Sequence, residues 1–267
     1  MTKSGKIRVG IGGWSFEPWE GTFYPSDLPK KRQLQFAGME LRAIEINSTY
    51  YSSQKPATFA KWAADVPDGF VFSLKASRFV TNRRVLAEAG ESVERFLTQG
   101  LTELGDHLGP ILWQFAPTKR FEPEDFEAFL KLLPEKQDGL KLRHVVEVRN
   151  PSFQAPDFVK LLEKHKAAVV LAEHADYPMI ADVTADFVYA RLQKGSDEVK
   201  TCYPPKELDL WAERLKTFAA GGEPDDLEKS APDRRADNTP RDVFAFFITS
   251  GKVNAPNGAR ELQKRVD

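Results

Sequence analysis

Polar side chains stand near the carboxyl ends of several apolar segments of this chain. Glu45 and Glu147 form a pair of carboxylates of the kind that can act as general acid and general base. Lys75 could bind an anion, or form a Schiff base if its surroundings lower its pKa. If the segments are parallel strands, the polar residues converge at one end of the fold. The full set is Glu45, Asn47, Lys75, Gln114, Glu147, Arg149, Glu173 and Arg191.

The same residues have a second interpretation, a fixed ion-pair network. Buried charges are costly unless they are paired, so Arg149 and Arg191 could neutralise Glu45 and Glu147 and hold the fold closed. Both interpretations stay open from the sequence. Carboxylate oxygens of Glu45, Glu147 and Glu173 could also bind a hard cation. Because the chain shows no close cluster of Asp and Glu, we expect no metal.

Two glycine-containing segments near the C-terminus predict an anion site. They read KGSDE at 194–198 and SGK at 250–252, and NAPNGA follows. Glycines let backbone N–H groups approach a ligand, and phosphate sites in barrels often use the last two strand-to-helix loops and a helix N-terminus. The alternative is ordinary turn chemistry, with Asn257 as a helix N-cap. The glycines are Gly195, Gly251 and Gly258, and the cations are Arg191, Lys194 and Lys252.

Aromatic residues gather beside the same strand ends. They could stack on the base or sugar ring of a ligand, or they could form a plug that packs the first loop over the fold. We expect Trp19 and Phe23 to belong to the plug, and we leave Trp14, Tyr50 and Tyr51 open. His174, at the end of the sixth predicted strand, is the one histidine well placed for the site. The aromatic set is Trp14, Phe16, Trp19, Tyr24, Tyr50 and Tyr51.

Alternating strand and helix patterns must position these residues. Val, Ile and Phe are frequent in the strand segments, as is typical when both faces are covered. The predicted strands are 7–14, 43–49, 70–77, 110–116, 144–150, 167–174, 187–193 and 242–249. The predicted helices are 29–39, 56–66, 92–107, 124–133, 156–166, 205–220 and 257–266, with Ser92 as one N-cap.

The alternation predicts a single α/β domain over residues 1–267, a (β/α)8 TIM-type barrel with parallel strands. One helix is degenerate, because the segment after strand six, DYPMIADVTA, is short and interrupted. The alternative is an open doubly wound sheet, but the chain has no GxGxxG or Walker loop to support it. Residues 221–241 are charged and rich in proline, so we expect a mobile insertion on the lower face, outside the site.

Composition excludes several classes of protein. The chain has 267 residues, a net charge of −1 and one cysteine, Cys202, so an intrachain disulfide and a cysteine-based zinc site are excluded. The near-neutral balance predicts no strong general attraction to nucleic acid or to an anionic membrane. We expect a cytoplasmic protein without a membrane span, since the N-terminal residues pass directly into a strand. The sequence identifies no cofactor and no oligomeric state.

Six motifs in order resemble the YecE-like family, a bacterial and archaeal domain of unknown function. They are GIGGWSFEPWEGTFYP, AIEINSTYY, FSLKAS, LGPILWQFAP, VVEVRNPSF and DFVYARL. The resemblance spans about residues 7–266 and implies a TIM-type barrel, but it implies no established reaction.

Three positions depart from the family pattern. Asn150 and Gln193 stand where the family usually has histidine, and Thr249 with Ser250 replaces a pair of asparagines. The loss of two histidines argues against an imidazole-dependent role.

Three functions remain open from the sequence. The first is an enzyme acting on a small anionic, phosphorylated ligand at the carboxyl ends of the strands. The second is a nucleic-acid-binding or processing barrel that uses Arg78, Arg83 and Arg84 together with the aromatic residues. The third is a non-catalytic scaffold that binds a ligand or a protein partner.

Overall fold

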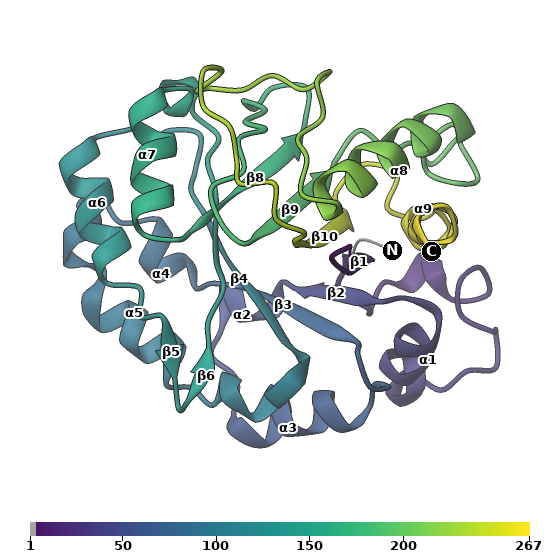
Figure 1. The fold of residues 1–267 in the computed structure, drawn as a ribbon. Coiled ribbons are helices and arrows are strands. Elements are labelled where there is room, and N and C mark those ends of the chain that lie inside the picture. Colours follow the sequence, from purple (N-terminus) through teal and green to yellow (C-terminus); the bar gives the residue numbers. More distant parts are fainter. Residues whose placement is uncertain (1–3) are drawn as a thin grey trace.

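Eight parallel strands form a closed barrel in the computed structural model, which describes residues 4–267 (Figure 1). Each strand pairs with its neighbours in parallel, and β1 closes the barrel against β10. The TIM-type barrel predicted from the sequence is therefore confirmed. The barrel strands are β1 Ile7–Gly12, β2 Ala43–Ile46, β3 Val71–Lys75, β4 Leu108–Gln114, β7 His144–Glu147, β8 Ala168–Glu173, β9 Phe187–Leu192 and β10 Asp242–Phe247.

Helices cover the outside of the barrel after most strands. Many of them begin with proline in the first turn, where its missing N–H costs nothing. They are α1 Gln33–Glu40, α3 Pro56–Ala64, α5 Gly90–Leu97, α6 Pro123–Lys131, α7 Pro156–Lys164, α8 Pro205–Ala219 and α9 Ala255–Val266. No helix lies between β8 and β9, so the degenerate unit is confirmed. Short helices α2 Ser48–Tyr51 and α4 Arg78–Thr81 follow β2 and β3, and a small hairpin, β5 Lys136–Gln137 with β6 Leu140–Lys141, precedes β7.

Two predicted helix boundaries are wrong. The segment 92–107 divides in two: α5 ends at Leu97, and Gly100, with a φ of 101°, precedes a 3-10 helix at Leu101–His107. Ser92 lies inside α5 and is not its N-cap. Asn257 lies within the first turn of α9, which has Asn254 at the N-cap position.

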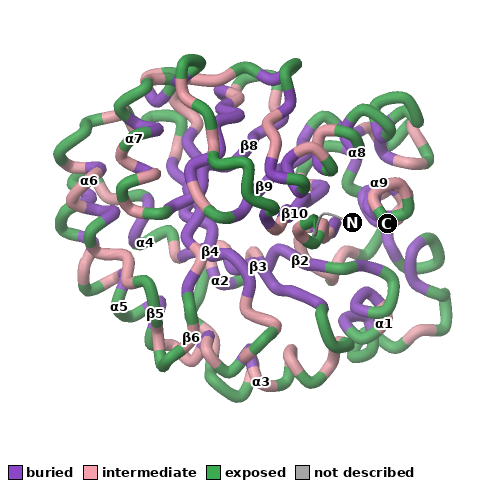
Figure 2. Tube along the Cα trace, in the orientation of Figure 1, coloured by how far each residue is buried: buried purple, intermediate pink, exposed green. Residues whose placement is uncertain are grey.

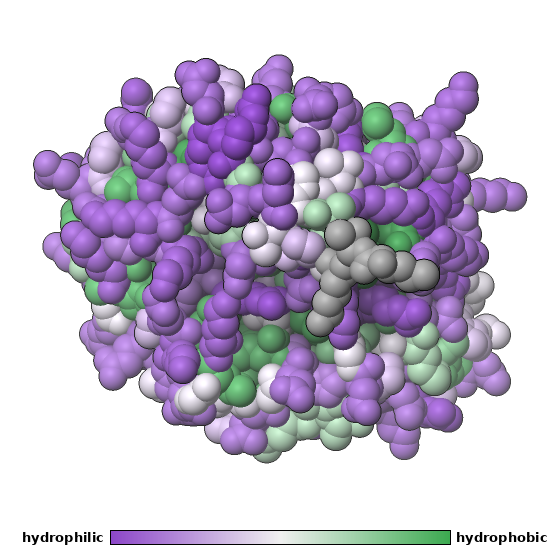
Figure 3. All heavy atoms as spheres, in the orientation of Figure 1, coloured by the Kyte–Doolittle hydropathy of each residue, from purple (hydrophilic) through white to green (hydrophobic). Residues whose placement is uncertain are grey.

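The core has two layers. A large outer layer packs the strands against the helices, and a smaller inner layer fills the barrel with residues such as Leu112, Phe187 and Phe244. Figure 2 shows the buried strands at the centre and exposed residues on the surrounding loops and helices. The face drawn in Figure 3 is mostly hydrophilic, with small apolar patches between charged side chains.

The lower end of the barrel is sealed by an ion-pair cluster. Arg8 and Arg143 both donate to the Asp242 carboxylate, at 3.4 and 3.2 Å, and both guanidinium groups lie over the Phe244 ring. The polar residues of interest lie at the opposite end, where the strands terminate.

The charged segment 221–241 packs along the barrel wall beside β8 (Figure 1). The buried Asp182 carboxylate accepts hydrogen bonds from the backbone N–H groups of Ser230 and Ala231, and Ala181 N–H donates to the Glu228 carbonyl. Leu227 is buried. The segment thus covers the wall that the degenerate unit leaves without a helix, and it is not confined to the lower face as we expected. Its mobility stays a prediction.

Candidate functional site

Arg191 lies at the centre of the polar end of the barrel. Side chains of β9 alternate, so Phe187, Tyr189 and Arg191 all point inward. The Arg191 guanidinium donates to both Glu45 oxygens, at 3.1 and 3.0 Å, and also to Glu147. Both glutamates are fully buried and Arg191 is 2% exposed. The three residues therefore form a buried ion-pair layer across the barrel.

Neutral side chains complete the hydrogen bonds of this layer. The Tyr189 hydroxyl donates to Glu45 at 2.8 Å, and Gln114 donates to Glu147 at 2.9 Å. Arg149 donates to the remaining Glu147 oxygen at 2.9 Å. Each carboxylate oxygen has at least one donor, as buried charges require.

Glu147 is held in its ionised form. Burial alone would raise the pKa of Glu147, but Arg191 and Arg149 outweigh burial and keep this pKa below its usual range. An ionised Glu147 cannot serve as a general acid at neutral pH. The geometry therefore favours the ion-pair network for this carboxylate over acid–base chemistry.

Lys75, the last residue of β3, has no ion-pair partner among residues 4–267, whereas Arg149 and Arg191 near it are both paired with carboxylates. Its ammonium nitrogen lies 4.3 Å from the centre of the Tyr50 ring. Burial, followed by the nearby Arg191 charge, lowers the pKa of Lys75 to about 8. A partly buried amine with this pKa can bind an anion or act as a nucleophile.

The mouth of the barrel is the end that holds the Arg191 layer and the polar residues around it. Asn47 follows β2, and its amide donates to the Glu45 carbonyl at 3.3 Å, its one side-chain hydrogen bond among residues 4–267. A side chain at Gly12 would meet Ile248 at 2.9 Å and Asn47 at 3.4 Å. The structure thus brings together most of the predicted set: Glu45, Asn47, Tyr50, Lys75, Gln114, Glu147, Arg149 and Arg191.

Trp14 does not join this group. Its ring packs edge-on to Trp62 of α3 at 5.4 Å and near Phe72 at 6.5 Å, in the layer between barrel and helix. Trp19 and Phe23 are buried and their rings pack together, 6.1 Å between centroids. That they form a plug over the barrel stays a prediction. Because an aromatic residue after a strand can face the mouth or the helix layer, the sequence could not place Trp14.

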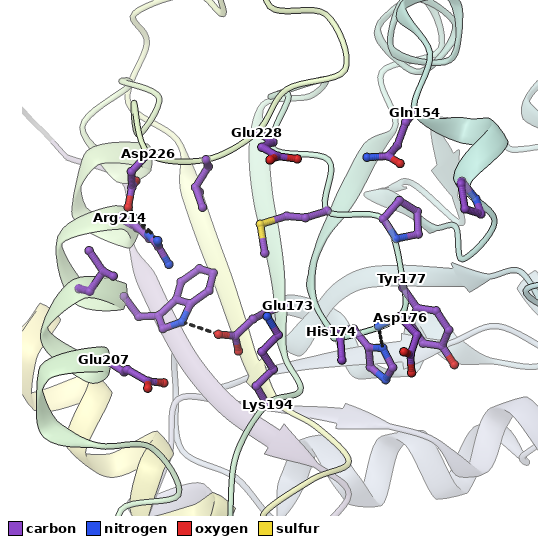
Figure 4. A pocket seen from close by; sticks show the side chains of 17 residues that line it. Gln154, Glu173, His174, Asp176, Tyr177, Lys194, Glu207, Arg214, Asp226 and Glu228 are labelled. Carbon is purple, nitrogen blue, oxygen red and sulfur yellow. Dashed lines mark hydrogen bonds and ion pairs between the residues drawn. The ribbon is translucent and has the colours of Figure 1, made fainter.

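A separate cavity of about 740 Å³ opens where the helix after β8 is missing (Figure 4). Glu173, His174 and Lys194 line it, together with Tyr177 and Trp211. Tyr203 and Trp211 donate to the Glu173 carboxylate, and burial raises the pKa of Glu173. Three residues of the predicted site, Glu173, His174 and Lys194, therefore lie beside the mouth and apart from the Arg191 layer.

Tyr177 links the cavity to the mouth. Its ring stacks on His174 with centroids 3.9 Å apart, and the Arg149 guanidinium carbon lies 4.5 Å from the Tyr177 ring centre. The sequence analysis missed Tyr177 because it lies in the irregular segment after β8. It also missed Tyr189, although a residue two positions before Arg191 on a strand must share its face.

The glycines of the predicted phosphate cradle lie against other parts of the protein. A side chain at Gly195 would meet the Cys202 sulfur at 2.3 Å, and one at Gly251 would meet the same sulfur at 2.7 Å. A side chain at Gly258 would meet Phe247 at 2.7 Å. These glycines allow two loops to pack closely, and the anion site at these loops stays a prediction.

A carboxylate of the protein also occupies the start of α9. Asp197 accepts a hydrogen bond from Val253 N–H at 2.9 Å, and its carbonyl accepts one from Asn254 at 2.9 Å. The Lys252 ammonium lies over the Phe16 ring at 4.3 Å. An anion at this position would compete with the charge of Asp197.

The described part of the chain contains no group of three or more His, Cys, Asp and Glu residues arranged to hold a metal ion. Within residues 4–267, no helix is both long and apolar enough to cross a membrane. Cytoplasmic localisation stays a prediction.

Comparison with known proteins identifies a family that spans nearly the whole chain. A sequence model of the family described as "Protein of unknown function DUF72" matches residues 8–267. The curated UPF0759 protein YunF of Bacillus subtilis is 23% identical over 201 residues, which are 73% of this chain and 68% of YunF.

Two solved structures of DUF72 family proteins share the fold. One, from Thermotoga maritima, has a TM-score of 0.72 and 22% identity, covering 97% of this chain and 98% of that protein. Another, from Enterococcus faecalis, has a TM-score of 0.69 and 19% identity, covering 97% and 95%. At these identities the likeness shows the fold alone.

Proposed function

The chain belongs to the DUF72 family of unknown function. We propose that it binds a small anionic ligand at the mouth of the barrel. We infer that the YecE-like motifs describe the same family. The observation that carries the proposal is Lys75, a partly buried cation at the mouth without a carboxylate partner among the described residues.

The charge balance of the mouth supports an anionic ligand. Arg191, Arg149 and Lys75 are three cations, and Glu45 with Glu147 supplies two negative charges. One positive charge is unbalanced at a site of low dielectric, where an unpaired charge is costly. A bound anion would neutralise this charge and raise the pKa of Lys75 toward its ordinary value.

Lys75 is also the residue we propose for any chemistry at this site. Glu147 is held ionised by two arginines, whereas Lys75 has a pKa of about 8 and, when no anion is bound beside it, keeps a fraction of neutral amine at physiological pH. A neutral amine can attack a carbonyl carbon. Glu45 and Glu147 then act by fixing Arg191, to which both are hydrogen-bonded.

A thermal-shift screen tests the binding proposal. Phosphosugars, nucleotides and small carboxylates are added to the wild type, to Lys75→Met and to the control Lys160→Met, which changes an exposed lysine on α7. A ligand specific for the folded state raises the melting temperature by mass action. We expect an anion to raise it in the wild type and the control but not in Lys75→Met. Equal shifts in all three proteins would refute the role of Lys75.

A second function, nucleic-acid binding, is favoured by one surface feature. Phe79 and Tyr51 are 63% and 62% exposed, and the Arg78 guanidinium lies 5.5 Å from the Phe79 ring. Exposed aromatic rings next to arginines are typical of surfaces that stack single-stranded bases. Retention on a single-stranded oligonucleotide column that falls with salt, and that is lost in Phe79→Ala, would support this function.

A further inference from the structure

Gln193 is a buried amide at the mouth with an unpaired terminal atom. It is 3% exposed, and its Nε2 has no hydrogen-bond partner in the described structure. A buried polar group without a partner costs about 1–3 kcal/mol, so such groups are rare in folded proteins. We therefore expect a function of the Gln193 amide that offsets the free-energy cost of its unpaired Nε2 group.

The backbone places the Gln193 side chain in the layer above Arg191. Its N–H donates to the Glu173 carbonyl at 3.1 Å, and Leu192 accepts from Ile248 N–H, so strand pairing continues past β9 on both sides. Phe187, Tyr189 and Arg191 point inward, and Gln193 occupies the next inward position of the same alternation.

The layer above Arg191 differs from the layer below it in its hydrogen bonding. Below, the oxygens of Glu45 and Glu147 all accept hydrogen bonds. Above, Lys75 has no described carboxylate partner and Gln193 has an N–H group without an acceptor. Lys75 and the Gln193 Nε2 group are therefore donors without a described partner, and a ligand that supplies acceptor oxygens would complement them.

We infer that Gln193 is a specificity-determining residue whose amide N–H donates to a carboxylate of the ligand, alongside Lys75 and Arg149. This inference rests on the proposed function and narrows its ligand to a singly charged oxyanion. One unbalanced positive charge at the mouth matches one negative charge. A phosphate monoester, one form of the phosphorylated ligand expected from the sequence, carries close to two negative charges and would leave one of them unbalanced.

The experiment compares Gln193→Leu with a matched control, Gln263→Leu. Gln263 is also a buried amide, but it bonds the Val9 N–H at 2.8 Å and lies on α9, away from the mouth. Urea unfolding measures the stability of each protein without ligand. NMR titrations measure the dissociation constants of three probes: lactate, dimethyl phosphate and inorganic phosphate.

We expect wild type and Gln263→Leu to bind lactate more tightly than either phosphate, and Gln193→Leu to bind lactate about tenfold more weakly. Without ligand, Gln193→Leu should be as stable as the wild type or more stable, because it removes an unpaired amide. Gln263→Leu should lose stability, because it leaves Val9 N–H unpaired.

Distinct results would overturn the inference. If Gln193→Leu binds lactate as the wild type does, or loses stability as Gln263→Leu does, the amide is structural. Tighter binding of dimethyl phosphate would refute the carboxylate, and tighter binding of inorganic phosphate would refute the single charge. If Lys75→Met loses lactate and Gln193→Leu does not, only this inference fails. If the wild type binds none of the probes, the proposed function fails with it.

Discussion

At the scale of single residues, the mouth contains two kinds of polar side chain: those with ion-pair or hydrogen-bond partners in the protein, and those without such partners in the described structure. Arg191 has carboxylate oxygens on both sides and stays charged, so it behaves as part of the barrel core. Lys75 and Gln193 have no such partners in the described structure. The difference shows why charge alone does not identify a functional residue: the partners decide whether a charge is structural.

The lowered pKa of Lys75 predicts how the free energy of unfolding depends on pH. Its pKa is about 8 in the folded state and about 10.5 when unfolded, so between these values the unfolded chain binds more protons and stability rises with pH. Below pH 8 the folded state holds an unfavourable charge. Lys75→Met removes it and should raise the free energy of unfolding at pH 7, by on the order of 2 kcal/mol after allowance for partial exposure.

Urea titrations at pH 7, 8, 9 and 10 check this prediction. The advantage of Lys75→Met over the wild type should shrink as the pH rises from 8 to 10. Lys160→Met, on the surface of α7, should show a difference that does not change with pH. A constant difference for Lys75→Met would mean that the folded pKa of Lys75 is ordinary.

At the scale of elements, alternation and helix spacing predicted the barrel because each strand must bury both faces. They also placed Glu45, Glu147 and Arg191 together, since inward positions at parallel strand ends meet. The predicted phosphate cradle shows what sequence cannot distinguish. Gly195 and Gly251 have the same sequence signature whether they admit a ligand or a neighbouring loop, and only the packed Cys202 sulfur distinguishes the two.

The segment 221–241 replaces a missing helix, and Asp182 anchors it. The buried Asp182 carboxylate accepts hydrogen bonds from the Ser230 and Ala231 N–H groups, at 2.7 and 3.1 Å. Asp182→Ala leaves these donors without their partner, at a cost of about 1–3 kcal/mol. We expect the variant to be cut within 221–241 by low concentrations of protease while the rest of the barrel stays resistant.

Limited proteolysis with mass spectrometry of the fragments checks this outcome. Asp186→Ala is the control, because Asp186 pairs with Lys141 on the surface and surface pairs contribute little. Cleavage spread over the whole chain in Asp182→Ala would show that the segment is needed to hold the barrel together.

At the scale of the whole molecule, we expect the lower end of the barrel to stabilise the fold and the mouth to bind the ligand. The lower end is closed by Asp242, which accepts from Arg8, Arg143 and the Lys6 N–H. Burial alone would raise the pKa of Asp242, but the Lys6 N–H and the two arginines outweigh it and lower this pKa. The carboxylate therefore contributes stability above its unfolded pKa of about 4, and loses it as the pH falls.

This division predicts opposite effects of substitutions at the two ends. Asp242→Asn removes a carboxylate that two arginines share, so it should lower the free energy of unfolding at pH 7 by about 1–3 kcal/mol and leave the ligand dissociation constant unchanged. Lys75→Met should do the reverse, gaining stability and losing the ligand. Urea unfolding and ligand titration of both variants measure the four values. If Asp242→Asn weakens binding as much as Lys75→Met, the mouth depends on the lower cluster and the ends are not independent.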